Sequence, residues 1–307
     1  MAQFTAKDVA ELRKQTGCGM MDCKNALTDA NGDFEAAVKI LREKGMAATA
    51  KKAARIAAEG LVDVMTIGNT TAIVEVNSET DFVAKNAIFQ QFVKDILKTI
   101  IENKPADVDA LMECSFLGDE GGLVKDALAE KTYKIGEKLS IRRFQVVEGV
   151  VSTYIHGLGM TGIVVSFDTD VADKDGFAEF AKNVALQTAA MPVQYLDKDS
   201  VPASVLDEEK AILLKQMEQD PKMAGKPQQV LEKIVLGKLS KFYENNCLLD
   251  QLYVKDDSMT VGKYVAATAK ELGGSIKVTG YVRFDKGEGI EKREEDFAAE
   301  IEKMVKG

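Results

Sequence analysis

The sequence predicts an α+β protein, in which a small helical module precedes a core of two related sheet-and-helix subdomains. Three observations support this prediction. Apolar residues recur at helical spacing through residues 1–46, they alternate at strand spacing from Leu61 onward, and the strand pattern returns about 89 residues later. With 307 residues the chain has room for two or three domains.

Residues 1–46 are predicted to form a bundle of three helices. Thr5 and Asp8 have the spacing of a capping box at the start of the first helix, and Gly32 and Gly45 are expected to end the second and third. The apolar faces consist of Val9 and Leu12, then Cys23, Ala26, Leu27 and Ala30, then Phe34, Ala37, Val38 and Leu41. A bundle of this size normally works as a docking module. Residues 47–60 are rich in Ala and Lys and are interpreted as a helical linker.

Residues 61–140 are predicted to form the first subdomain of the core. Apolar and polar residues alternate over 61–67 and again over 71–77, with a turn at 68–70, which indicates a β-hairpin. A helix follows, because Phe89, Phe92, Val93 and Ile96 have the spacing of one helix face.

Residues 141–200 and 247–286 are predicted to form the second subdomain, which repeats the first. At an offset of 89 residues Gly157 corresponds to Gly68, and Asp170 corresponds to Asp81. The helix face also recurs, as Phe177, Phe180, Ala181 and Val184. Residues 276–285 alternate like a strand and are expected to join the second sheet.

Residues 201–246 are interpreted as a helical hairpin inserted into the second subdomain, with a turn enforced by Pro221, Gly225 and Pro227. Its helices are expected to pack as a short coiled coil, with Val205, Ile212 and Leu213 facing Leu231, Ile234, Val235 and Phe242. Packing within the hairpin is favoured over dimerisation through it.

Residues 287–307 are predicted to form a C-terminal helical module. Its apolar stripe consists of Phe297, Ile301, Met304 and Val305. Such a helix usually docks on its own domain, and contact with a partner is a further expectation.

Composition and charge indicate a protein partner. The net charge of -9 and the pI near 5.0 oppose nucleic-acid binding, which depends on clustered Lys and Arg. The basic stretch 44–55 is interpreted as the solvated face of the linking helix. The four cysteines lack CxxC spacing and there is one histidine, so neither a metal site nor a cofactor is expected. Without a signal-peptide pattern or a membrane-spanning run, a cytoplasmic protein with reduced thiols is expected.

Catalytic motifs are not found in the sequence. It has no GxxxxGK[ST] phosphate loop, no GxSxG nucleophile elbow and no HExxH metal motif. His156 follows a predicted strand and precedes glycines, which favours a structural histidine over a general base. The GLGMTG run after it leads into a strand rather than a helix, so it is not a convincing dinucleotide-binding loop.

The most informative short segment is 77–86, NSETDFVAKN, which joins the first hairpin to its helix. Ser78, Thr80 and Asp81 are candidate N-caps. Phe82 lies seven residues before Phe89, so a helix that included both would bury Phe82, and the residue pattern alone favours burial. The second copy carries Val171 at this position, which leaves open that Phe82 is an exposed aromatic for a partner.

Several of these segments resemble the elongation factor Ts family of bacteria. They are TGCGMMDCKNAL near the N-terminus, EVNSETDFVAKN, IGEKLSIRRFQVVEG, YIHGLGMTGIVVSF and GYVRFDKGEGIEKREEDFAAEI, in the order typical of the family. The resemblance covers essentially the whole chain, and it identifies residues 1–46 with a domain similar to ubiquitin-associated (UBA) domains.

The resemblance implies a guanine-nucleotide exchange factor that is not itself an enzyme. Its partner would be elongation factor Tu, contacted at the GTPase domain and a second domain, in a complex that includes a possible dimer or 2:2 assembly. Phe82 would be a wedge that enters the GTPase domain and disturbs its magnesium site. The residues that match the contact segments of the family are Thr80, Asp81, Phe82 and Val83 in the core, and Leu12, Arg13, Thr16, Gly17, Gly19, Met20 and Met21 in the N-terminal domain.

One departure from the family pattern lies in the second subdomain. Where the family commonly has histidine before a Val-Ala-Ala or Ile-Ala-Ala stretch, this chain has Gln187 in LQTAAMP, which puts the details of a partner contact there in doubt. Two other functions stay open at this point. One is a general docking adaptor built on the N-terminal bundle, and the other is an enzyme with an unrecognised carboxylate pair.

Overall fold

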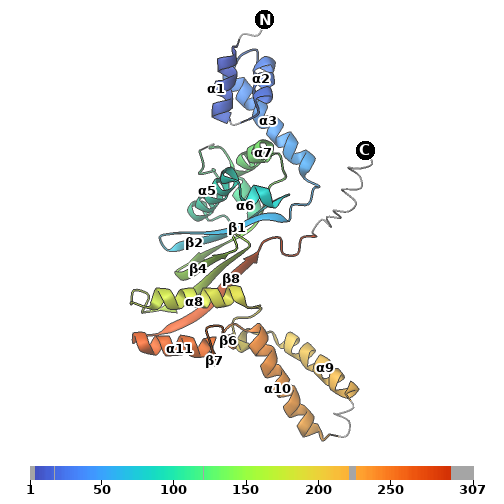
Figure 1. Ribbon diagram of the computed structural model, residues 1–307, viewed down its shortest axis with the longest axis vertical. Coiled ribbons are helices and arrows are strands. Elements are labelled where there is room, and N and C mark those ends of the chain that lie inside the picture. The colour runs from blue at the N-terminus through green and yellow to red at the C-terminus, as the bar shows by residue number, and fades with distance from the viewer. Residues whose placement is uncertain (1–3, 17, 120, 221–225, 292–307) are drawn as a thin grey trace.

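The computed structural model describes residues 4–16, 18–119, 121–220 and 226–291. The described chain is elongated, with a helical bundle at one end, a helical hairpin at the other and a layered core between them (Figure 1). It combines helices with antiparallel sheets, so the predicted α+β class is confirmed.

The N-terminal bundle consists of α1 (Ala6–Thr16), α2 (Met20–Asp29) and α3 (Phe34–Lys52). The predicted capping box is present, because Thr5 N–H donates to Asp8 Oδ2 at 2.6 Å and Asp8 N–H donates to Thr5 Oγ1 at 3.4 Å. The predicted apolar faces meet in one cluster that includes Val9, Leu12, Cys23, Ala26, Leu27, Ala37 and Leu41.

The prediction that Gly45 ends the third helix is wrong. Helix α3 continues to Lys52, and Gly45 is buried where α3 crosses α7 (Val124–Ile135). A Cβ at position 45 would lie 3.3 Å from the carbonyl oxygen of Ala129. The glycine therefore permits close packing of the two helices. The sequence alone does not tell a glycine with this role from one that ends a helix.

The first core subdomain is a three-stranded antiparallel sheet covered by helices on one face. The strands are β1 (Glu59–Ile67), β2 (Thr70–Ser78) and β3 (Ser140–Glu148), in the order β1-β2-β3. The predicted hairpin is confirmed, with Ile67 paired to Thr70 across the turn. The covering helices are α4 (Asp81–Ala84), α5 (Ala87–Asn103), α6 (Val108–Met112) and α7. The predicted face of α5 is buried, as Phe89, Phe92, Val93 and Ile96.

The second subdomain repeats this plan. Its strands β4 (Val150–His156), β5 (Thr161–Thr169) and β8 (Ile276–Asp285) form a sheet in the order β4-β5-β8, so residues 276–285 join the sheet as predicted. The covering helices are α8 (Phe177–Ala190) and α11 (Val261–Leu272), and a small hairpin of β6 (Leu252–Tyr253) and β7 (Asp256–Thr260) lies beside them. A short 3-10 turn, η1 (Lys198–Ser200), follows α8.

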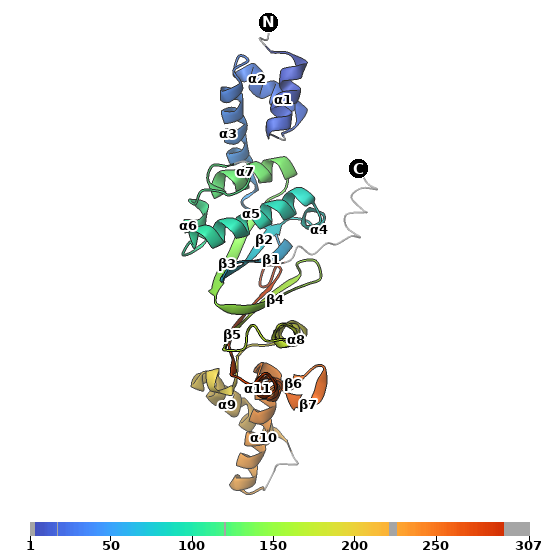
Figure 2. The same ribbon diagram turned by 90° about the vertical axis from the view of Figure 1, so that its left-hand side faces the viewer.

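The two sheets pack against each other between the two helical layers (Figure 2). Adjacent residues of one strand therefore serve different cores: Leu61 packs toward the helices of the first subdomain, whereas Val62 joins Ile73, Val164 and Phe284 between the sheets. This explains why the central strand β2 is buried along almost its whole length.

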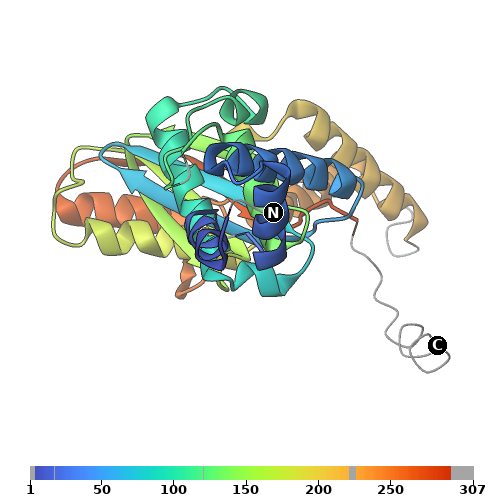
Figure 3. The ribbon, with the colours of Figure 1, turned by 90° about the horizontal axis from the view of Figure 1, so that it is seen from above.

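The inserted hairpin consists of α9 (Ala203–Gln219) and α10 (Gln228–Asn246) and extends beyond the core when the molecule is seen from above (Figure 3). The helices pack on each other as predicted, and the predicted stripe is confirmed in part, at Leu213, Leu231, Ile234 and Val235. The buried residues of the contact stripe are Leu213, Met217, Val235 and Leu239, with Leu206, Leu231, Ile234 and Tyr243 at the margin. Ile212 is exposed and Val205 and Phe242 lie outside the stripe, because the helix period carries these positions away from the partner helix.

Two predicted features lie wholly or partly outside the described residues. They are residues 221–225 of the hairpin turn and residues 292–307 of the C-terminal module.

Candidate partner-binding site

Phe82 is exposed on a single helical turn, and the pattern-based expectation of burial is wrong. Its side chain is 77% exposed, whereas the adjacent Val83 is buried in the first core. The two helices are separate: α4 ends at Ala84, and the side chain of Asn86 accepts a hydrogen bond from Ile88 N–H at 2.8 Å to begin α5. Phe82 and Phe89 therefore lie on different helices, and their spacing places them on no common face. The cap formed by Asn86 is the sequence signal that was missed.

The start of α4 is held by a residue from another element. Glu137, which follows α7, accepts hydrogen bonds from Thr80 N–H at 2.9 Å and from Thr80 Oγ1 at 2.6 Å. Ser78 Oγ donates to Thr80 O at 2.9 Å. Thr80 is the N-cap of α4, but its hydroxyl makes no capping bond to the helix. Of the predicted caps, Thr80 thus occupies the position without making the bond.

The segment after β2 and the segment after α7 share a further hydrogen bond, in which the donor lies after α7 and the acceptor lies after β2. Glu79 accepts a hydrogen bond from Lys138 N–H and pairs with Arg55, whose Nη1 lies 3.2 Å from Glu79 Oε1. Lys138 Nζ donates to the carbonyl oxygens of Ala53 and Arg55, at 2.7 and 2.8 Å. The end of β2, the residues after α3 and the residues after α7 are thereby fastened together.

Asp81 and Lys85 flank the exposed ring. Lys85 Nζ lies 2.8 Å from Asp81 Oδ2 and 5.8 Å from the centroid of the Phe82 ring. The hydrogen bond from Lys85 lowers the pKa of the Asp81 carboxyl below its ordinary value. Asp81 is therefore ionised at neutral pH, and the site presents an apolar ring beside the ion pair of Asp81 and Lys85.

The position that corresponds to Phe82 in the second repeat is buried. Asp170, which corresponds to Asp81, accepts a hydrogen bond from Ser275 N–H at 2.7 Å, and Val171, which corresponds to Phe82, is buried in the second core. The second repeat therefore carries a buried valine where the first carries an exposed phenylalanine, although Asp170 itself is exposed.

The N-terminal candidate residues divide into buried and exposed sets. Leu12 is completely buried in the bundle, and Thr16 is buried with its hydroxyl donating to Leu12 O at 2.7 Å. Arg13, Gly19, Met20 and Met21 are exposed, and Gly17 lies outside the described residues. Leu12 and Thr16 thus support the segment from inside, while the two methionines are the large apolar side chains that it offers.

Gln187 is buried inside the second subdomain. Its Nε2 donates to Gln251 Oε1 at 3.1 Å and to Leu252 O at 3.2 Å, and its Oε1 accepts from Val254 N–H at 2.8 Å. The side-chain amide thereby fixes the β6–β7 hairpin against α8. Gln187 is completely buried, so it stabilises the second subdomain through internal hydrogen bonds.

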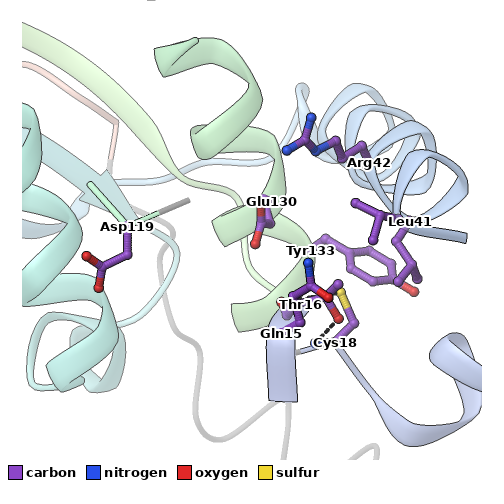
Figure 4. Close-up of a pocket in the computed structure, with 9 residues that line it drawn as sticks. Gln15, Thr16, Cys18, Leu41, Arg42, Asp119, Glu130 and Tyr133 are labelled. Atoms are coloured by element: carbon purple, nitrogen blue, oxygen red, sulfur yellow. Dashed lines mark hydrogen bonds between the residues drawn. The ribbon is translucent and has the colours of Figure 1, made fainter. Parts of the chain in front are cut away.

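A cavity of about 170 Å³ lies between the N-terminal bundle and α7 (Figure 4). Its lining includes Thr16, Cys18, Arg42, Glu130 and Tyr133. Burial raises the pKa of the Cys18 thiol and of the Tyr133 phenol, so both groups stay protonated at neutral pH. The lining therefore offers neither a thiolate nor a phenolate nucleophile.

The single histidine of the chain, His156, is exposed, with its Nδ1 3.0 Å from Tyr154 Oη. Among the described residues there is no cluster of His, Cys, Asp or Glu that could hold a metal ion. Within the same residues, no helix has the length and apolar character needed to cross a membrane.

The described elements define an α+β protein with a duplicated core, an N-terminal helical bundle and one outward-facing aromatic tip. The family model for Elongation factor TS matches residues 79–288. Curated relatives named Elongation factor Ts match nearly end to end. The protein from Clostridium kluyveri is 46% identical over 99% of both chains, and that from Syntrophotalea carbinolica is 45% identical over 99% of this chain and 100% of its own. The protein from Clostridium tetani is 46% identical over 98% of this chain and 99% of its own.

This chain belongs to the elongation factor Ts family. The family consists of nucleotide exchange factors that serve elongation factor Tu in translation. The predicted family is thus confirmed, and the resemblance found in short motifs extends over the whole chain.

Proposed function

We propose that this chain binds elongation factor Tu in its GDP-bound form and accelerates GDP release through binding alone, without a chemical step. The observation that carries the proposal is Phe82, a large apolar side chain that is 77% exposed on a firmly held turn. Large exposed apolar residues braced by a rigid scaffold are typical anchors for a partner pocket.

Thermodynamic linkage explains how such binding releases a nucleotide. A partner that binds nucleotide-free Tu more tightly than Tu·GDP must weaken GDP binding by the same factor. Burial of Phe82 in a pocket of Tu would favour the nucleotide-free state by about 1.5–3 kcal/mol. A shift of the elements around the magnesium and phosphates of Tu would then lower GDP affinity.

We assign further contacts with Tu to the residues beside Phe82, to the N-terminal bundle and to the second subdomain. Asp81 and Val83 flank the ring, one as an exposed charge and one as its internal anchor. The exposed residues Arg13, Gly19, Met20 and Met21 would meet the GTPase domain, with Leu12 and Thr16 supporting them from inside. The second subdomain would meet a second domain of Tu. Such a role belongs in the cytoplasm, where translation takes place.

The test is the rate of release of fluorescent GDP from Tu as the concentration of this chain is raised. Phe82→Ala should lower the second-order rate constant about 10- to 100-fold, because 1.4 kcal/mol corresponds to a factor of ten. The matched control is Leu236→Ala, which removes an exposed leucine from α10 and should leave the rate unchanged. Equal rates for wild type and Phe82→Ala would contradict the proposal.

A further inference from the structure

We propose that Glu137 is a positioning residue that sets the direction of Phe82 from outside the loop that carries it. The inference deepens the proposed function and rests on it for its effect on GDP release. It also predicts a property of the free protein, the order of the Phe82 side chain, which is measurable without any partner.

Helix α4, which carries Phe82, is too short to be stable without contacts from other elements. Helix α4 has four residues, far below the length at which a helix is stable by itself. An N-cap hydroxyl normally stabilises such a turn by accepting a hydrogen bond from the helix backbone. In this chain the Thr80 hydroxyl instead donates to Glu137, and the N–H of Thr80 does the same. One carboxylate thus fixes both the backbone and the side chain of the residue two places before Phe82.

Glu137 itself comes from a rigid position. Helix α7 ends at Ile135, and Gly136 closes it with φ of +86° while its N–H donates to Thr132 O at 3.1 Å. Ala127 and Leu128 bury α7 in the first core, and its other side packs against α3 at Gly45. The carboxylate therefore projects from a helix end that is anchored on two sides, 57 residues along the chain from Thr80.

Val83 alone does not fix the ring. Its side chain anchors the middle of α4 to the core, and Gln90 Nε2 donates to Ala84 O at the end of the turn, at 3.0 Å. At the start of the turn, the two bonds from Thr80 to Glu137 add to the bond from Ser78 Oγ to Thr80 O and tie the turn to the end of α7. Lys85 pairs with Asp81 beside the ring. Removal of Glu137 should leave the fold intact and let the Phe82 ring sample several directions.

The first experiment is a double-mutant cycle on GDP release from Tu. Glu137→Ala should lower the second-order rate constant about tenfold in the wild-type background, as expected for lost hydrogen bonds to a charged group. In the Phe82→Ala background the same change should cost less than about twofold, because the two residues act as one unit. Glu137→Gln should retain most of the activity, since its oxygen can accept the Thr80 N–H bond and its amide can donate to the hydroxyl.

The control is Glu148→Ala, which removes an exposed glutamate that pairs with Lys104 at the other end of β3. Glu148→Ala should leave the second-order rate constant of GDP release unchanged in both the wild-type and the Phe82→Ala backgrounds. Equal losses from Glu137→Ala in both backgrounds would show a general structural role and overturn the inference. No loss in the wild-type background, together with a loss for Phe82→Ala, would overturn the inference while leaving the proposed function standing.

The second experiment needs no Tu. With 4-fluorophenylalanine at position 82, the fluorine resonance of the free protein should be sharp and shifted in the wild type, and should move toward the free amino acid value in Glu137→Ala. Thermal melts of both proteins show whether the core is retained. An unchanged resonance in a folded Glu137→Ala protein would overturn the inference, whatever the exchange assay gives.

Discussion

Neighbouring residues of the candidate site have opposite environments. Phe82 is exposed and Val83 is buried, because the single turn of α4 directs one side chain outward and the next into the core. The exposure of Phe82 could be anticipated from the family resemblance, but the residue pattern predicted burial. The missing information was the helix break at Asn86, which depends on a cap bond that propensities alone do not establish.

Gln187 is a buried residue whose contacts the sequence pattern does not predict. Its spacing in α8 predicts only that it lies near the core, whereas its three hydrogen bonds depend on the β6–β7 hairpin, more than 60 residues further along the chain. Polar networks between distant segments are set by tertiary packing and leave no local sequence pattern.

The Gln187 network gives a prediction at the residue scale. Gln187→Leu should lower the free energy of unfolding by about 1–3 kcal/mol, because it removes the hydrogen-bond partner of the buried Gln251 side chain and of the partly buried Val254 N–H. Urea denaturation measures the loss. Gln187→His, which keeps a ring nitrogen able to accept, should lose less. Equal stabilities of wild type and Gln187→Leu would show that water replaces the amide.

Among the elements, most of those predicted correctly have strong periodicity, but one periodic helix was missed and one helix end has a tertiary cause. The β1–β2 hairpin and α5 follow directly from their apolar patterns. Helix α11 went unpredicted although Val261 and Val265 have helical spacing, so its signal was available. The continuation of α3 past Gly45 had no such signal, since a buried glycine at a helix crossing and a glycine at a helix end look alike in a sequence.

The crossing of α3 and α7 gives a prediction at the element scale. Gly45→Val should lower the free energy of unfolding by about 1–3 kcal/mol, because its side chain would meet the backbone of Ala129. Gly237→Ala in α10 is the matched control, since a Cβ there meets no atom within 4 Å. It should stabilise the protein by up to about 1 kcal/mol, the helix propensity difference. A neutral Gly45→Val would indicate that the bundle is not docked on α7 in solution.

At the scale of the whole molecule, the buried carboxylate of Glu75 connects the two sheets of the core. Glu75 in β2 is fully buried, pairs with Arg142 and Arg143, and accepts a hydrogen bond from Gly287 N–H at 2.8 Å, just beyond β8. Burial alone would raise the pKa of Glu75, but these hydrogen bonds outweigh it and hold the pKa below its ordinary value of 4.5.

A pH dependence follows at this scale. A carboxyl whose folded pKa is lowered stabilises the fold fully above its unfolded value, near 4.5, and this contribution is lost as the pH falls through the folded pKa. Glu75→Gln should therefore cost about 3 kcal/mol at pH 7, and the difference from wild type should shrink below pH 4.5. Denaturant midpoints across pH 3 to 7 measure it, with Glu148→Gln as a surface control. A difference that stays constant through this range would contradict the assignment.

The duplication has a consequence for how this chain can change over generations. A Cβ at Gly274 would lie 2.3 Å from Val171 and 2.4 Å from Asp170, so the packing of residues 170 and 171 depends on the absence of a side chain there. Substitution of that glycine would displace Asp170 and the buried Val171, whereas the exposed side chain of Phe82 meets no such restriction. The two repeats are therefore under unequal constraint at this position: Val171 is held by the second core, whereas the side chain at position 82 is free to vary without disturbing the first.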